Sequence, residues 1–270
     1  MKVQNKVIVV TGGGNGLGRE LVLSLLSRGA RVAAVDINTS ALAETAELSG
    51  VKNDNLTTHA VNIADKGAVE ALPDHIISQH SAVDGLINCA GIIQPFVRLK
   101  DLAYEAIDRV MNVNFFGTLY MTKAFLPHLL MRPEAHIANI SSMGGFMPFP
   151  GQSIYGASKA AVKLFTEGLN SELIGTNVRV TIVFPGAVGT NIMFNSGVTM
   201  SEKMVSEQCA MKRLMLSSNK AARIIADGIE RDRHRILVGK DSAFMDFIYR
   251  LSPRGAARFV YHQMKSLLPA

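Results

Sequence analysis

Cysteine is scarce in this chain, and long apolar runs are absent. The two cysteines, Cys89 and Cys209, are too few for a disulfide framework, and no CxxC or Cys/His spacing indicates a metal site. The N-terminal apolar run Val7–Val10 is too short for the core of a signal peptide, and no stretch approaches the roughly 18 apolar residues of a membrane span. We therefore expect a cytoplasmic protein without bound metal, either soluble or in contact with a membrane only at its surface.

Internal repeats, low-complexity segments and linkers rich in proline or serine are also absent, which indicates a single domain. The 270 residues are 48% hydrophobic and 19% charged, a balance that excludes a disordered chain and is typical of a globular enzyme. No recognised nucleic-acid-binding module accompanies the net charge of +6, so we expect no nucleic acid partner.

The positive charge gathers near the C-terminus, where residues 231–265 carry eight lysines and arginines against three acids. Residues 241–270 combine this charge with an apolar, helix-like pattern that is interrupted near Pro253. Such a basic amphipathic extension suits an anionic substrate, an acidic membrane surface or a neighbouring subunit. A solvated helix face is an equally good interpretation.

Short β-branched runs alternate along the chain with longer stretches of helical spacing. Strands that are apolar on both faces and joined by helices predict a doubly wound parallel sheet of about seven strands, covered by helices on both sides. We expect this domain to span residues 1–240 and the helical extension to follow it. The expected strands are Val7–Val10, Val32–Val35, Leu56–Val61, Val83–Ile87, His136–Ile140, Val178–Phe184 and Arg235–Val238.

A glycine-rich segment, TGGGNGLG at 11–18, joins the first expected strand to a helical stretch that begins at Arg19. At such a junction backbone N–H groups can approach a pyrophosphate, which then lies at the helix N-terminus. Three glycines can also merely form a turn. Here, however, strand, loop and helix follow one another in the order that dinucleotide binding requires.

Asp36, at the end of the second expected strand, is the acid that dinucleotide binding needs after the glycine segment. A carboxylate there can accept hydrogen bonds from the adenosine ribose hydroxyls and would repel a 2′-phosphate. The alternative is a cap for the following helix. Asn15, Ile37 and Asn38 stand where a lysine or arginine would offset the charge of Asp36. We therefore expect NAD(H) rather than NADP(H).

Tyr155 and Lys159 are four residues apart in YGASK, so they share one face of a helix. A nearby ammonium and the positive ring of an oxidised nicotinamide would both lower the pKa of the phenol, which is about 10 in water. Ser142, just after the strand that ends at Ile140, could hold a substrate oxygen near the tyrosine. Alone, each residue is better explained by packing or capping; together, behind a nucleotide-binding loop, they predict proton transfer.

In this combination the chain resembles the short-chain dehydrogenase/reductase family, in its subgroup with short Rossmann-type chains. The resemblance covers about residues 3–240 and implies an NAD(P)-dependent oxidoreductase that acts on alcohols and carbonyls, assembled as a homodimer or homotetramer. The motifs occur in the family's order: TGGGNGLG at 11–18, Asp36, NCAG at 88–91, Asn114, Ser142, YGASK at 155–159 and PGAVGT at 185–190.

The resemblance also implies a role for each matching residue. Tyr155 would move the proton of the substrate oxygen, Lys159 would lower the pKa of Tyr155 and bind the nicotinamide ribose, and Ser142 would orient the substrate. Asn114 would use its helix backbone to hold a water that links Lys159 to solvent. The further cofactor contacts would come from Gly12, Asn15, Gly16, Leu17, Gly18, Asp36, Ile37, Asn62, Ile63, Asn88, Ala90, Gly91, Pro185, Gly186, Val188 and Thr190.

Two positions depart from the family pattern. Asn62 replaces the usual aspartate that meets the adenine amino group, and its amide oxygen can accept the same hydrogen bond. Cys89 replaces the second asparagine of the family's NNAG, and we expect a small structural thiol there without reactivity. Neither departure affects the residues expected to carry the chemistry.

The substrate should be recognised after Thr190, where five methionines (193, 200, 204, 211 and 215) precede Ser218. Flexible apolar side chains suit a lid, at about 190–218, over a bulky apolar ketone or secondary alcohol, whereas a helix with inward-packed methionines is the alternative. The apolar segment 144–152 is expected to face the same pocket. A reductase of a long-chain acyl thioester or aldehyde is the other enzymatic hypothesis, and a nucleotide-sensing regulatory protein is the non-enzymatic one.

Overall fold

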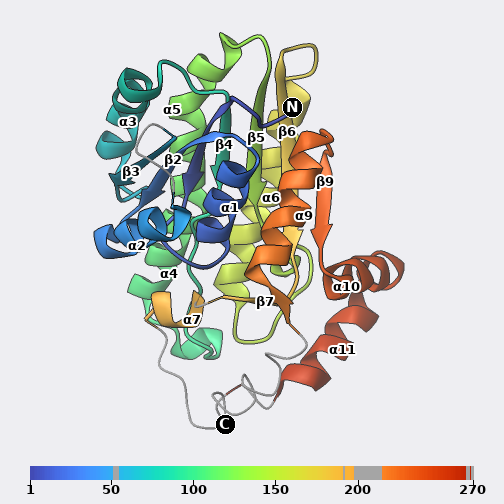
Figure 1. Cartoon of the computed structure of the whole chain (residues 1–270). Coiled ribbons are helices and arrows are strands. Elements are labelled where there is room, and N and C mark those ends of the chain that lie inside the picture. The colour runs from blue at the N-terminus through green and yellow to red at the C-terminus, as the bar shows by residue number, and fades with distance from the viewer. Residues whose placement is uncertain (51–54, 191, 198–214, 266–267, 269–270) are drawn as a thin grey trace.

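The structure, a computed structural model, describes residues 1–50, 55–190, 192–197, 215–265 and 268. Its centre is a parallel seven-stranded sheet in the order β3-β2-β1-β4-β5-β6-β9 (Figure 1). Each expected strand is present within a residue or two of its predicted bounds, and the parallel α/β fold is confirmed. The strands are β1 (Val7–Thr11), β2 (Arg31–Asp36), β3 (Leu56–Ala60), β4 (Gly85–Asn88), β5 (Ala135–Ile140), β6 (Val178–Pro185) and β9 (Arg235–Val238).

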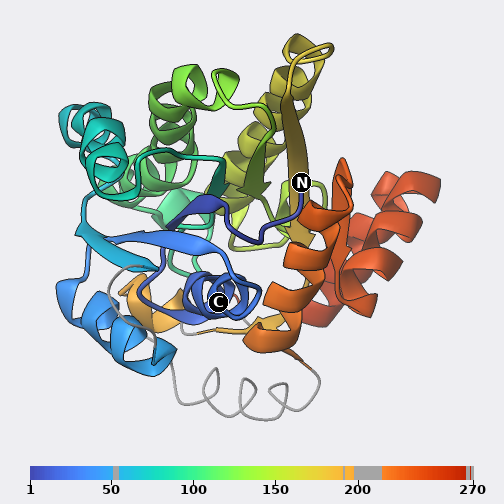
Figure 2. The ribbon, with the colours of Figure 1, turned by 45° about the horizontal axis from the view of Figure 1, so that its top comes forward.

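Helices cover both faces of this sheet and bury it between two apolar layers (Figure 2). Because β1 is buried along its whole length, its sequence VIVVT is continuously apolar or small rather than alternating. One face carries α1 (Gly16–Ser27), α2 (Thr39–Ser49) and α9 (Ser218–Glu230); the other carries α3 (Lys66–His80), α4 (Tyr104–Met111), α5 (Thr118–Leu130) and α6 (Ser153–Glu172).

The chain changes its winding direction at β1, which pairs with β2 on one side and with β4 on the other. The loops that follow β1 and β4 therefore diverge toward opposite faces of the sheet. Divergent loops leave a crevice at the carboxyl ends of the strands, which is where ligands bind in open α/β sheets. The glycine-rich segment 11–18 and the segment 89–91 border this crevice.

The C-terminal extension is a pair of helices, α10 (Lys240–Leu251) and α11 (Pro253–Met264), and the break predicted near Pro253 lies between them. Among the described residues, no helix is both long and apolar enough to cross a bilayer. The sequence did not predict the two-residue parallel pair of β7 (Val188–Gly189) with β8 (Leu216–Ser217), because strands this short carry no periodic signal.

A cluster of buried histidines lies between β3 and α3. The Thr57 hydroxyl is 2.8 Å from Nε2 of His59 and 2.8 Å from Nε2 of His80. Burial lowers the pKa of His59 to about 4, with smaller effects from His75 and His80. Burial, followed by the charge of Arg31, also lowers the pKa of His80. Both histidines are therefore held neutral in the folded state.

We expect this cluster to make the fold sensitive to acid. Since the pKa of His59 is lower when folded, the unfolded chain takes up its proton first, and the free energy of unfolding falls as the pH drops from about 6.5 to about 4. The loss for His59 should be on the order of 3 kcal/mol at most. His59→Gln keeps a partner for Thr57 but takes up no proton, so its unfolding free energy should depend less steeply on pH. Denaturant titrations across this pH range test this, with a change of the exposed His234 to Gln as control. An equal dependence of the unfolding free energy on pH in the wild type, His59→Gln and His234→Gln would contradict the prediction.

Candidate active site

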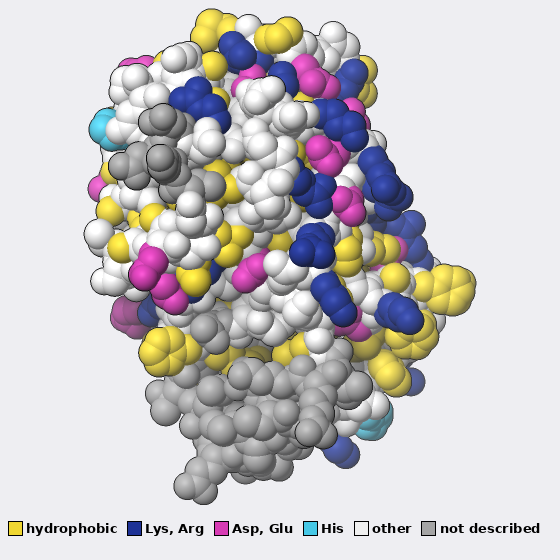
Figure 3. Space-filling model, in the orientation of Figure 1, with side chains coloured by type: hydrophobic (Ala, Val, Ile, Leu, Met, Phe, Trp, Pro, Cys, Tyr) yellow, Lys and Arg dark blue, Asp and Glu magenta, His cyan; other side chains and the backbone are white. Residues whose placement is uncertain are grey.

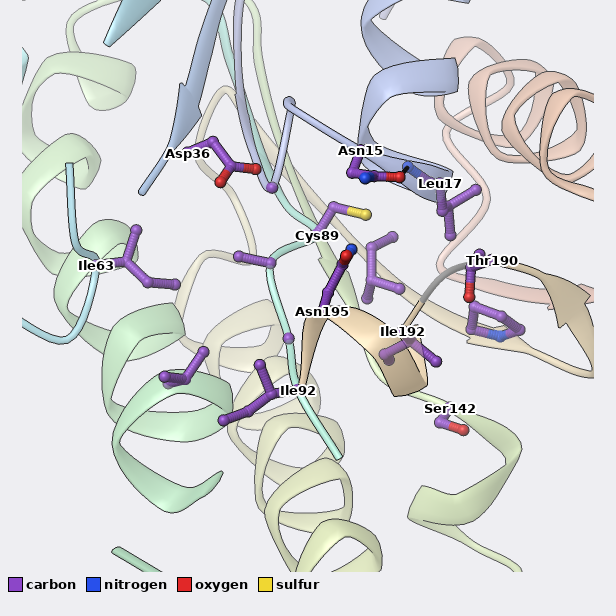
Figure 4. A pocket seen from close by; sticks show the side chains of 18 of the residues that line it. Asn15, Leu17, Asp36, Ile63, Cys89, Ile92, Ser142, Thr190, Ile192 and Asn195 are labelled. Atoms are coloured by element: carbon purple, nitrogen blue, oxygen red, sulfur yellow. Dashed lines mark hydrogen bonds between the residues drawn. The ribbon is translucent and has the colours of Figure 1, made fainter. Parts of the chain in front are cut away.

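A cavity of about 680 Å³ opens at the carboxyl ends of the strands. It is bordered by the glycine-rich loop after β1, by the ends of β2, β4, β5 and β6, and by α7 (Ile192–Asn195). In Figure 4, Asp36 lies at one side of the cavity and Ser142 at the opposite side, with Cys89 and Ile192 between them. The structure thus brings together residues from four distant parts of the sequence.

The glycine-rich loop folds back so closely on itself that Gly18 has no room for a side chain. A Cβ atom on Gly18 would lie 2.0 Å from the carbonyl oxygen of Gly12, and Gly12 itself has a φ of +71°. Asn15 begins α1 by accepting a hydrogen bond from the N–H of Gly16 at 2.7 Å. The backbone at the start of α1 is therefore presented directly to the cavity, as anion binding requires.

Asp36 is fastened to this loop. One carboxylate oxygen accepts from the N–H of Gly14 at 3.0 Å, and the other accepts from the N–H of Asn38 at 3.0 Å. The helix α2 is capped by Asn38, whose side chain accepts from the N–H of Ala41 at 3.0 Å. The alternative role for Asp36, a cap of the following helix, is therefore wrong, and its carboxylate lines the cavity.

The segment after β4 is joined to the glycine-rich loop by Thr11. Its hydroxyl oxygen accepts from the N–H groups of Cys89 at 3.0 Å and Ala90 at 3.1 Å. Asn88 departs from the prediction, because it does not line the cavity. Its buried amide donates to Thr122 and Asn139, so Asn88 joins β4 to β5 and α5 behind the cavity wall.

Ser142 lies on the wall opposite Asp36, and Tyr155 and Lys159 line the same cavity. The buried Lys159 ammonium donates to the carbonyl of Ile140, at the end of β5, at 2.9 Å. Ser142 forms a hydrogen bond with Tyr155 and also accepts from the N–H of Gly144 at 3.0 Å. Ser142 thus caps a short turn, as the simpler interpretation held, while also meeting the tyrosine.

The electrostatics of this wall are dominated by burial. Burial raises the pKa of Tyr155, and the hydrogen bond with Ser142 lowers it by less. Burial also lowers the pKa of Lys159 to about 8. Cys89, on the same cavity, has its thiol pKa raised to about 12, mainly by burial, so the thiol stays protonated. The expected acidification of the phenol by Lys159 therefore has to overcome its burial.

Asn114 lies directly behind the cavity, in a π-helical turn (Asn112–Gly117) between α4 and α5. Its side chain accepts from the N–H of Ile92 at 2.8 Å and donates to the carbonyl of Ile92 and the hydroxyl of Ser158, each at 2.9 Å. Asn114 thereby ties the segment after β4 to α6. The water relay expected of its backbone stays a prediction.

The far end of the cavity is formed after β6. Pro185, Gly186, Val188 and Thr190 line it as predicted, and α7 adds Ile192, Phe194 and Asn195. Arg109 of α4 holds the end of α7 by donating to the carbonyl of Ser196 at 2.8 Å. Of the predicted lid at 190–218, residues 191 and 198–214 lie outside the described residues, as do Met200, Met204, Met211 and Cys209.

The apolar segment 144–152 does not face the cavity, so that expectation is wrong. Phe146, Met147 and Phe149 pack instead against α10 and α11, and none of them lines the cavity. A turn at Met143–Gly145 directs these side chains away from Ser142 and toward the extension. Their apolar character therefore says nothing about the substrate.

Known proteins share both the sequence and this arrangement. The model of the short chain dehydrogenase family matches residues 6–201. SadH of Mycobacterium tuberculosis, named as an oxidoreductase, is 33% identical over 270 residues, which cover 98% of either chain. The chain belongs to the short-chain dehydrogenase/reductase family. Dehydrogenase/reductase SDR family member 7B of Bos taurus is 35% identical over 200 residues, covering 72% of this chain and 61% of that protein.

Solved structures of short-chain dehydrogenases/reductases share the fold. One from Burkholderia phymatum in complex with NAD superposes with a TM-score of 0.83 at 24% identity, covering 99% of this chain and 96% of the other. One from Burkholderia cenocepacia in complex with NADP gives 0.79 at 25% identity, with 96% and 99% covered. The 3-ketoacyl-(acyl-carrier-protein) reductase of Brucella melitensis with NADH gives 0.78 at 26%, with 89% and 98% covered.

Family membership confirms the resemblance and makes this protein an oxidoreductase of the short-chain dehydrogenase/reductase family. The regulatory-protein hypothesis is set aside. Every predicted site residue except Asn88 and Asn114 lines the cavity, although what each contributes to binding or catalysis stays a prediction. The assembly as a homodimer or homotetramer and the cytoplasmic location also stay predictions.

Sequence analysis of this dehydrogenase/reductase missed Gln94, which holds the first turn of the helix that carries Tyr155. The side chain of Gln94 is fully buried, and its oxygen accepts from the N–H groups of Ile154 at 2.7 Å and Tyr155 at 3.0 Å. Its amide nitrogen donates to the carbonyl of Gly151 at 3.1 Å. Since Gln152, next to the start of α6, makes no capping bond, Gln94 supplies the cap from a loop 60 residues away. No local motif marks such a residue.

We expect Gln94→Met to lower kcat by about tenfold or more, because two N–H groups beside Tyr155 lose their buried acceptor and the tyrosine loses its position. Gln94→Glu keeps the acceptor oxygens and should retain more activity, while its charge should move the pH profile of kcat upward. Steady-state kinetics across pH, alongside thermal unfolding, test this. A lower melting temperature with an unchanged kcat in Gln94→Met would show that Gln94 only stabilises the fold.

Proposed function

We propose that this protein is an NAD(H)-dependent oxidoreductase that interconverts a secondary alcohol and a ketone on a bulky apolar substrate, with Tyr155 as the acid/base. One observation carries the proposal. A single cavity is lined by the glycine-rich helix N-terminus, Asp36, Tyr155, Lys159 and Ser142, and Figure 4 shows Asp36 and Ser142 at opposite sides of it. A dinucleotide bound in this cavity would place its adenosine end near Asp36 and its reactive ring near Ser142.

The residues present fit such a cofactor. Gly12, Gly16 and Gly18 line the cavity with backbone alone, and a Cβ on Gly91 would lie 3.1 Å from the Lys159 ammonium. A Cβ on Gly18 would collide with the carbonyl oxygen of Gly12 at 2.0 Å, so only backbone can form this part of the cavity wall. A nicotinamide dinucleotide bound there would supply the hydride acceptor or donor. The protein's part is to bind, orient and manage the proton.

Tyr155 is placed to exchange that proton with the substrate oxygen. Its hydroxyl lies in the cavity wall and forms a hydrogen bond with Ser142, so a carbonyl or alcohol oxygen held there would meet two hydroxyl groups. In alcohol oxidation Tyr155, as phenolate, would take the hydroxyl proton. In ketone reduction Tyr155 would give its proton to the developing alkoxide, while Ser142 would stabilise the charge on that oxygen.

Lys159 would make this exchange possible near neutral pH. Bringing a phenol from a pKa of about 10 to neutrality requires about 4 kcal/mol, and burial of Tyr155 adds to that requirement. A positive charge acts most strongly in surroundings from which water is excluded, and Lys159 is only 4% exposed. The lowered pKa of Lys159, about 8, leaves the amine mostly protonated at neutral pH.

The preference for NAD(H) is proposed on Asp36. Its carboxylate is held at the cavity by two backbone N–H groups, where the 2′-phosphate of NADP(H) would be repelled. Arg19, the nearby cation, is already engaged by Gly14, Thr45 and Glu44. Similar structures contain NAD in one case and NADP in another, so the fold itself does not choose between them.

The apolar substrate is proposed on the cavity wall near α7. Ile92, Ile192 and Phe194 border the cavity on this side, and Phe194 is 82% exposed, leaving apolar surface for a ligand to cover. The similarity to a 3-ketoacyl-(acyl-carrier-protein) reductase is compatible with a ketone on an acyl chain. It gives no reason to prefer reduction of a thioester or an aldehyde.

Replacing Tyr155 by phenylalanine should lower kcat by about 10²- to 10⁴-fold, because the ring keeps its packing but loses the proton-transferring hydroxyl. NADH formation with a panel of secondary alcohols and polar sugars, ranked by kcat/KM, measures the loss in the best substrate. Cofactor affinity, measured by fluorescence titration, should change little. Equal turnover in the variant and the wild type would exclude the mechanism, and faster turnover of sugars than of apolar alcohols would exclude the substrate class.

The double change Asp36→Ala and Ile37→Arg should move the kcat/KM ratio of NADP to NAD upward by about tenfold or more, since it removes a repelling carboxylate and adds a cation for the 2′-phosphate. Ile37 is 70% exposed, so an arginine fits there without repacking. Ile37→Ala serves as control. A wild-type protein that binds NADP(H) more tightly than NAD(H) would contradict the role of Asp36.

A further inference from the structure

The outward face of the α10–α11 pair is apolar. Phe244, Phe247 and Leu251 of α10 are 53%, 60% and 70% exposed, and Phe259 and Tyr261 of α11 are 42% and 49% exposed. Figure 3 shows apolar side chains and lysines or arginines gathered over these helices at the lower right. Phe244, Phe247 and Leu251 recur along one side of α10, and Phe259 and Tyr261 lie on either side of the buried Val260 of α11. We call these five residues, together with Lys240, Arg254, Arg258 and Lys265, the outer face. Clustered exposed apolar residues of this size mark interaction surfaces more often than chance.

The outer face is not needed to hold the helices in place. Their inward residues, among them Met245, Ile248 and Val260, pack on the segment around Met147. Asp241 accepts from the N–H of Ala187 at 2.5 Å, and Ser242 donates to the carbonyl of Phe184 at 2.8 Å. The pair is thus fastened to the domain from one side, and its exposed phenylalanines are held outward on a fixed support.

Positive charge on this extension is not balanced by its own acids. Asp241 is occupied by Ala187, and Asp246 pairs with Arg235 at 2.6 Å and with Arg250 at 3.0 Å. Among the described residues 240–265, four cations form no ion pair. They are Lys240, Arg254, Arg258 and Lys265. Lys240 shares a face of α10 with Phe244 and Phe247, and Arg258 adjoins Phe259.

We propose that the outer face docks this protein on an anionic lipid bilayer. Aromatic and aliphatic side chains beside lysines and arginines are the composition of helices that lie in the bilayer interface, with apolar groups among the acyl chains and cations at the headgroups. A second copy fits less well, because a twofold contact would set these unpaired cations against themselves. An anionic bilayer supplies both the apolar medium and the opposite charge.

Docking would also place the catalytic cavity beside the membrane. The inward residues of α10 and α11 contact Phe146 and Phe149, which follow Ser142 closely in the chain. An apolar substrate leaving the bilayer would then travel only a short way to the cavity. This last step rests on the proposed substrate class, whereas lipid binding itself does not.

Co-sedimentation of the full chain with vesicles tests the docking without any turnover. We expect binding to vesicles of equal parts phosphatidylcholine and phosphatidylglycerol, weakened by salt, and little binding to phosphatidylcholine alone. Each cation near an anionic surface changes binding by a factor of about five, so Arg254→Glu with Arg258→Glu should weaken it roughly 25-fold or more. Phe244→Ser with Phe247→Ser should weaken it at least about tenfold.

Matched controls lie elsewhere on the surface. Lys123→Glu with Arg179→Glu reverses two exposed charges, and Leu48→Ser removes a side chain that is 57% exposed. Thermal unfolding verifies that each variant folds. If a variant does not fold, the salt dependence of vesicle binding by the wild type tests the proposal in its place. Absence of binding to the anionic vesicles, or equal losses in controls and outer-face variants, would overturn the proposal. The proposal would also be overturned if the wild type did not bind vesicles and the double variant Phe244→Ser with Phe247→Ser had a lower solution mass than the wild type. In that case the outer face would bind a second copy of the chain.

Discussion

The attachment of α6 to the carboxyl end of β5 is the constraint on which the site depends. The Lys159 ammonium donates to the carbonyl of Ile140, and the hydroxyl of Ser141 donates back to the carbonyl of Lys159 at 2.7 Å. The turn after β5 comes so close to α6 that a Cβ on Gly145 would lie 2.8 Å from that same carbonyl oxygen. Burying an ammonium without hydrogen bonds costs free energy. The contact between Lys159 and the carbonyl of Ile140 therefore restricts how α6 can pack against the end of β5. Tyr155, one turn earlier, is carried to the cavity by this contact.

The same exclusion of water acts in opposite directions on the two groups of α6. It raises the pKa of Tyr155 and lowers that of Lys159, because in each case the charged form loses its hydration. A phenolate at this site therefore needs positive charge close by, and Lys159 can supply it only while protonated. Because this wall of the cavity excludes water, a charge on it interacts strongly with other charges nearby. Such an environment would favour a reaction in which charge develops on an oxygen atom.

The two ends of the cavity are supported by different parts of the fold. At the end that carries Asp36, the side chains of Asp36 and Thr11 tie the ends of β1, β2 and β4 together by accepting from backbone N–H groups. At the other end, α7 is held to α4 by Arg109 and borders the cavity with apolar side chains. The extension packs behind the turn after Ser142, through Phe146, Met147 and Phe149.

The parallel α/β fold, the glycine-rich loop between β1 and α1, and the placement of Tyr155 and Lys159 on one cavity could be predicted from the sequence alone. Each depends on neighbours along the chain: β-branched runs for buried strands, glycines between a strand and a helix, and a spacing of four on one helix face. The break at Pro253 is equally local. Tertiary structure alone decided that Asn88 joins two strands behind the cavity, that Gln94 caps α6, and that the 144–152 segment packs on the extension. Those outcomes depend on contacts between residues dozens of positions apart, and no periodicity or motif records which distant partner a buried amide or an apolar side chain will meet.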